Sequence, residues 1–99
     1  PGTRRIYSNV GIDAVTTLAC ERAGAPDHNS LLRQRVVDPV GMTSSTVNGP
    51  ASHAGVGPVS DLARLAQELL APQALRADVI EAALTPSYPE LSGVLPGWC

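Results

Sequence analysis

The chain has 99 residues, enough for at most one small domain. Seven basic residues against nine acidic ones give a formal net charge of −2, which argues against a dedicated nucleic-acid binder because such proteins need a dense basic patch. Hydrophobic residues make up 43% of the chain and charged residues 16%, a composition typical of a folded protein. No apolar run approaches the ~18 residues that a membrane-spanning helix needs.

The composition also limits the chemistry and the core. All seven cations are arginine, so no reaction that depends on lysine can be carried by this chain alone. Phenylalanine is absent, so the core must be built from Ala, Leu and Val, which bury little area each, and we expect marginal stability. Cys20 and Cys99 lie far apart and outside any Cys-x-x-Cys pattern, so we expect two free thiols.

The first two predicted helices begin at polar capping residues. The first follows the segment that ends at Asn9, which can cap it, and Gly24 is its expected end. The second is expected over residues 27–37, with Asp27 as its N-cap and Pro39 as its stop, because proline disfavours helical geometry in the residue before it. The first helix rests on apolar residues at helical spacing, namely Ile12, Val15, Leu18 and Ala19.

The third predicted helix has the clearest pattern. It follows a polar loop over residues 41–57, begins at Pro58 and ends at Pro72. Asp61 places a negative charge near the positive end of its dipole. Its apolar face repeats at i, i+3, i+4 and i+7 through Leu62, Leu65, Ala66 and Leu69.

A fourth helix is predicted over residues 74–84, and the tail over residues 87–99 is expected to be irregular. No stretch shows the alternation of polar and apolar residues that is typical of a strand. The pattern alone therefore predicts a mainly α chain.

Most familiar chemical sites are disfavoured by spacing. His28 and His53 lie 25 positions apart without partners at metal-ligand spacing, so no metal site and no cofactor is expected. The stretch from Gly55 to Gly57 lacks the further glycine of a dinucleotide-binding turn. No serine lies in a Gly-x-Ser-x-Gly or Ser-x-x-Lys pattern.

Tyr7-Ser8-Asn9 is the remaining candidate. A tyrosine and an amide two positions apart, leading into a helix, present a phenol and a carboxamide on one loop. A phenol can give and take a proton, and an amide can both donate and accept hydrogen bonds. The residues alone also fit a half-buried tyrosine beside a helix cap.

Three stretches resemble the serine β-lactamase-related family, which includes class C β-lactamases, D-alanyl-D-alanine carboxypeptidases and esterases. Tyr7-Ser8-Asn9 is similar to its Tyr-x-Asn motif, and the stretch from Pro39 to Thr43 is similar to its Pro-Leu-Gly-Met-Thr stretch. The stretch from Val59 to Leu65 is similar to its Ser-x-x-Asp-Leu-Ala-Arg-Phe helix. The order and rough spacing agree, and the resemblance covers nearly the whole chain.

The resemblance implies acyl transfer to a serine, on a small-molecule substrate with a carbonyl group. It makes Tyr7 the catalytic acid/base candidate and Asn9 the substrate-binding candidate. In the family, a Ser-x-x-Lys nucleophile motif precedes the region that this chain resembles, and a third motif, Lys-Thr-Gly or His-x-Gly on a sheet strand, follows it. Residues 1–99 contain neither motif in that place. His53-Ala54-Gly55 imitates the third motif but lies in the loop before the third helix, without a strand pattern.

The resemblance thus implies that residues 1–99 are a partial domain, the helical lobe of an incomplete α/β serine β-lactamase or DD-peptidase fold. We expect the isolated chain to be inactive, and its apolar helix faces to favour self-association. Two alternatives remain: a non-catalytic helical module that binds a partner, and a structural helical domain with a coincidental motif. The location of the protein in the cell is left open.

Overall fold

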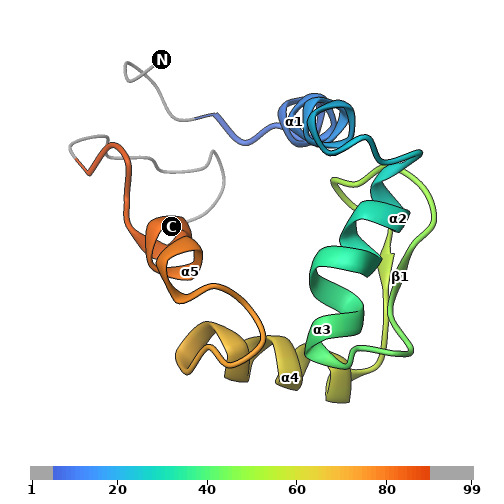
Figure 1. Ribbon diagram of the computed structural model, residues 1–99. Helices are drawn as coiled ribbons and strands as arrows, with labels where there is room; N and C mark the ends of the chain where they lie inside the picture. The colour runs from blue at the N-terminus through green and yellow to red at the C-terminus, as the bar shows by residue number, and fades with distance from the viewer. Residues whose placement is uncertain (1–5, 90–99) are drawn as a thin grey trace.

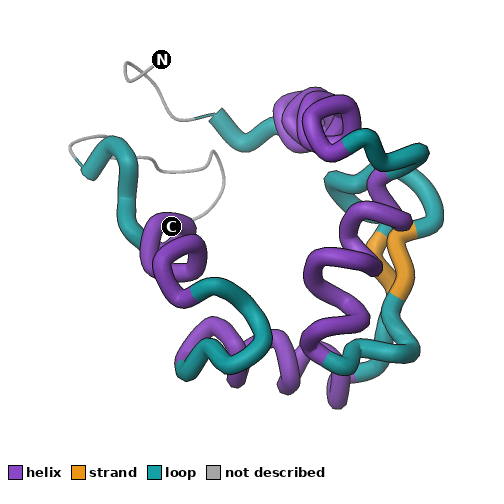
Figure 2. Tube along the Cα trace, viewed as in Figure 1, coloured by secondary structure: helices purple, strands orange, loops and turns teal. Residues whose placement is uncertain are grey.

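The computed structural model describes residues 6–89. The helices follow one another around an open arc, from α1 through α2, α3 and α4 to α5, and the two short strands lie along the outer side of α2 and α3 (Figures 1 and 2). This arrangement confirms the prediction of a mainly α chain. In chain order the elements are α1 (Asn9–Ala23), α2 (His28–Leu32), η1 (Arg33–Val37), α3 (Asp38–Val40), β1 (Thr46–Val47), β2 (Gly55–Val56), α4 (Val59–Leu70) and α5 (Ala77–Leu84).

The start of α1 differs from the prediction by one residue. Ser8 is the N-cap, in extended geometry, and its hydroxyl oxygen accepts a hydrogen bond from the Gly11 N–H at 3.0 Å. Asn9 is instead the first residue of the helix, so its predicted capping role is wrong. Both residues belong to types that cap helices, and the backbone angles decide between them. The predicted end is confirmed, because Gly24 closes α1 in the left-handed conformation with φ 64°.

The second helix begins as predicted and continues past its predicted end. Asp27 caps it by accepting a hydrogen bond from the Ser30 N–H at 2.8 Å, and this bond lowers the pKa of the Asp27 carboxyl. The prediction that Pro39 stops the helix is wrong, since α2, the π-helical turn η1 and α3 run without a break to Val40. Pro39 is the second residue of α3 and directly follows the π-helical turn and Asp38. Gly41, with φ 76°, ends the run.

The polar loop contains a small antiparallel sheet that the sequence pattern did not indicate. β1 pairs with β2 in the register Thr46 to Val56 and Val47 to Gly55. Each strand has two residues, too few to display alternation. After β2 the chain reaches Pro58, the N-cap residue of α4.

α4 begins one residue later than predicted, because Pro58 is its extended N-cap, and it ends at Leu70, two residues before Pro72. α5 begins three residues later than predicted. One oxygen of Glu68, Oε2, accepts hydrogen bonds from three successive backbone N–H groups, those of Gln73, Ala74 and Leu75, at 3.0, 3.0 and 3.1 Å. These bonds tie the segment between the two helices to the last turn of α4, ahead of the start of α5. The same bonds lower the pKa of the Glu68 carboxyl.

The core of the described residues is small. Val37, Met42 and Ile80 are its buried hydrophobic side chains, from η1, the loop and α5 respectively. α1 has no buried residue, and large apolar side chains on α1, α4 and α5 are exposed. None of the described helices has the length and hydropathy to cross a membrane.

Candidate functional site

The predicted site residues lie at the N-terminal end of α1. Tyr7 directly precedes the Ser8 cap and is 74% exposed, so the phenol is not packed among aliphatic side chains. Asn9 is also exposed, as the first residue of the helix. The cap fixes the backbone between them because the Ser8 side chain is held by the Gly11 N–H. The structure therefore presents both side chains at one helix end.

One residue of α1 ties this helix end to a distant loop. The Asp13 carboxylate accepts two hydrogen bonds from Ser52, 39 positions away: one from the backbone N–H at 3.0 Å and one from the hydroxyl at 3.2 Å. The Ser52 oxygen also lies 2.9 Å from Nδ1 of His53. The hydroxyl has a single proton, so donation to Asp13 leaves it to accept from a protonated Nδ1. The sequence analysis did not single out Asp13 or Ser52.

His53, the first residue of the stretch that imitates the His-x-Gly motif, contacts Ser52, which the sequence pattern did not suggest. Its ring is exposed and faces Ser52, its neighbour in the chain. Gly55, the last residue of the imitation, lies in β2, so the expectation that this stretch has no strand is wrong at that position. β2 is two residues long and pairs with β1.

A second polar anchor holds the loop that follows α3. Asp61 in the first turn of α4 is 4% exposed, and its Oδ2 accepts from the Ser44 N–H at 3.0 Å and from the Ser45 hydroxyl at 2.9 Å. The sequence had indicated only a charge near the helix dipole. Arg64, one turn later, donates to the Gly41 carbonyl at 3.3 Å. Asp61 and Arg64 of α4 therefore hold the loop from Gly41 to Ser45 by side-chain hydrogen bonds.

Gly57 is required by this anchor. A Cβ placed on Gly57 would lie 2.2 Å from the Ser45 hydroxyl oxygen and 3.3 Å from the Ser45 Cα. The close approach of the loop to Ser45 therefore admits no side chain. Gly57 therefore has a packing role, whereas a Cβ on Gly55 would meet no atom within 4 Å.

Two depressions in the described part of the surface have linings that do not include the residues of the motif. One, of about 290 Å³, lies between α1, the start of α2 and the loop, and its lining includes Asp13, Cys20 and His28. Another, of about 240 Å³, is mostly apolar and lies between η1, the small sheet and α4. Tyr7 and Asn9 line neither of them.

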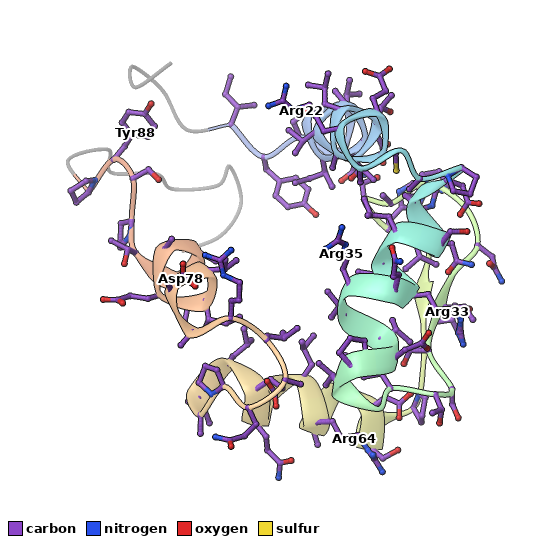
Figure 3. The ribbon with its side chains drawn as sticks, in the orientation of Figure 1. Arg22, Arg33, Arg35, Arg64, Asp78 and Tyr88 are labelled. Atoms are coloured by element: carbon purple, nitrogen blue, oxygen red, sulfur yellow. The ribbon has the colours of Figure 1, made fainter. Side chains whose placement is uncertain are left out.

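The cations of the described chain are spread over several elements. Figure 3 shows Arg33 on the outer side of the arc and Arg35 on its inner side, facing away from the sheet. Arg33 lies 4.0 Å from Asp38 in an exposed ion pair, and Arg76 pairs with Asp78, which lowers the pKa of that carboxyl. Among residues 6–89, His, Cys, Asp and Glu form no group of three or more that could hold a metal ion.

Comparison with known proteins shows which fold this chain shares. No family model matches the chain, and no curated protein matches it in sequence. Among solved structures, the chain is similar to the crystal structure of a β-lactamase from Mycobacterium bovis, with a TM-score of 0.87 and 34% sequence identity. The match covers 98% of this chain and 36% of that one, so the chain spans about a third of the length of the β-lactamase. The chain thus has the fold of the matching helical part of a β-lactamase.

Proposed function

We propose that this chain is the helical, motif-bearing part of a serine hydrolase related to the β-lactamases, acting through an acyl-enzyme on an amide, lactam or ester. The observation that carries the proposal is the structural match to the mycobacterial β-lactamase, which extends over 98% of the chain at 34% identity. The aligned region spans nearly all of this chain.

We assign Tyr7 the role of acid and base, and Asn9 the role of holding the substrate amide. The exposure of Tyr7 and the fixed cap beside it support this assignment, because a proton carrier must reach the reacting atoms. Asn9 offers both a donor and an acceptor, which suits an amide group of the substrate. The alternative of a non-catalytic helical module has no specific observation in its favour.

The motifs of this chain do not supply the nucleophile that the proposed reaction needs. The chain contains no lysine and therefore no Ser-x-x-Lys motif. Without the attacking serine and the donors that stabilise the oxyanion, Tyr7 has no acyl transfer to assist. We therefore propose that the isolated 99-residue chain forms no covalent adduct with a fluorescent penicillin, and mass spectrometry of the incubated chain measures this.

A hybrid enzyme tests the role of Tyr7. The matching segment of the Mycobacterium bovis β-lactamase is replaced by this chain, and hydrolysis of a chromogenic cephalosporin is followed. Tyr7→Phe removes only the phenol oxygen, and we expect kcat to fall by about 100-fold or more, the usual contribution of a positioned acid/base. Tyr88→Phe is the matched control, since Tyr88 is the other described tyrosine and lies after α5, far from Tyr7 along the chain. Tyr7→Phe with the activity of the control would contradict the proposal.

A further inference from the structure

The first half of α1 makes few contacts with the rest of the described fold. Residues 6–12 are all exposed, and Asp13 is the first residue of the helix that is half-buried. The hydrogen bonds of the Ser8, Thr16 and Thr17 side chains are local, within four positions. In residues 6–89, the two bonds between Asp13 and Ser52 join α1 to a segment far along the chain.

Asp13 is well placed to orient the helix end. It follows Asn9 by four positions, so the two residues lie one above the other on the same face of α1. The two bonds use both carboxylate oxygens, Oδ1 for the Ser52 N–H and Oδ2 for the Ser52 hydroxyl. Two bonds to one carboxylate fix rotation of the helix about its axis as well as its distance from the loop.

We propose that Asp13 and Ser52 are positioning residues for the Tyr7 and Asn9 side chains. The inference rests on the proposed function, because it concerns where the phenol and the amide lie relative to a bound substrate. The pair holds the first turns of α1 in one orientation against the loop at residues 50–53. Neither residue touches the substrate, and the effect of the pair reaches it through the helix.

A small displacement of the N-terminal end of α1 would move the Tyr7 and Asn9 side chains relative to the substrate. A displacement of a catalytic group by about 1 Å can cost about 100-fold in rate. α1 buries no side chain, so packing supplies little resistance to such a displacement. The two hydrogen bonds between Asp13 and Ser52, one turn after Asn9, therefore supply a directional constraint that packing does not provide there.

Amide hydrogen exchange on the 99-residue chain is the first test. Asp13→Ala removes both acceptors, and we expect exchange of the amides at residues 12–16 to become at least about fivefold faster. Ser52→Ala keeps the backbone donor and should give a smaller increase, while Ser52→Thr keeps both donors and should exchange as the parent chain does. Thr16→Val is the matched control, because it removes only the local bond to the Ile12 carbonyl. Equal exchange in Asp13→Ala and Thr16→Val would overturn the proposal.

The hybrid β-lactamase supplies the functional test. We expect Asp13→Ala to lower kcat by about tenfold with a smaller change in KM, and Ser52→Thr to retain the parent kcat. Loss of activity in Tyr7→Phe together with parent activity in Asp13→Ala overturns this inference and leaves the proposed function standing. Parent activity in Tyr7→Phe refutes the proposed function, and with it any role of the pair in catalysis. A double variant of Asp13 and Ser52 that loses no more than Asp13→Ala alone supports one shared contact.

Discussion

Substitution of Gly57 tests the packing of the loop against Ser45. In Gly57→Ala the new methyl would lie 2.2 Å from the Ser45 hydroxyl oxygen and 3.0 Å from its Cβ, so Ser45 must move. Movement of Ser45 breaks its 2.9 Å hydrogen bond to the buried Asp61 carboxylate. The substitution therefore combines overpacking with the loss of a charge-assisted hydrogen bond.

The expected loss is large for a chain of this size. Overpacking costs about 1–3 kcal/mol, and a hydrogen bond to a charged group is worth about 1.5–3 kcal/mol. The two effects share one displacement and are not additive, so we expect Gly57→Ala to destabilise by about 2–4 kcal/mol. Domains of this size are stable by about 5–15 kcal/mol, so the variant should lose a large fraction of its stability.

Urea denaturation followed by circular dichroism at the helix band measures this loss. Gly55→Ala is the matched control, because a Cβ at Gly55 meets no atom within 4 Å and its backbone does not require glycine. We expect Gly55→Ala to change stability by less than about 0.5 kcal/mol. If Gly57→Ala is as stable as Gly55→Ala, the close approach of the loop to Ser45 is absent in solution and the reasoning fails.

Three further predictions concern the helix cap, a carboxylate and the apolar surface. Ser8→Ala should destabilise by about 1 kcal/mol in urea denaturation and Asn9→Ala by much less, because Ser8 makes the cap bond; equal losses would contradict the assigned cap. The lowered pKa of Glu68 means that its stabilising contribution is present above its ordinary value of 4.5 and is lost as the pH falls through the lower folded value. The urea midpoint should therefore fall less in Glu68→Gln than in the parent chain between about pH 6 and about pH 3. Light scattering should show a mass that rises with concentration, and less so when the exposed Val59 and Leu70 are both replaced by Gln; a concentration-independent monomer would refute this self-association.

Local signals were sufficient for the helix termini that depend on one or two residues. Asp27 caps its helix and Gly24 ends the one before it because capping and left-handed geometry are properties of single residue types. The prediction that Pro39 stops the helix was wrong because the backbone of Asp38 stays helical before it, at the end of the π-helical turn η1, which a local pattern does not reveal. The start of α5 was predicted three residues too early, and the segment before it is held by Glu68, five or more positions earlier, in a contact that a local pattern does not reveal.

The place of Tyr7-Ser8-Asn9 at the start of a helix was predictable, but the contacts of that helix were not. Tyr7 and Asn9 are close in sequence, so a short pattern can reveal them, and their exposure fits the chemistry proposed for them. Asp13 and Ser52 are 39 positions apart, and an aspartate within a helix and a serine within a polar loop are each unremarkable alone. Only the fold brings the two together. A match to Tyr-x-Asn in another chain therefore gains weight when a distant donor anchors the helix one turn after the asparagine, because exposed motif side chains on an unanchored helix end have no fixed position from which to act.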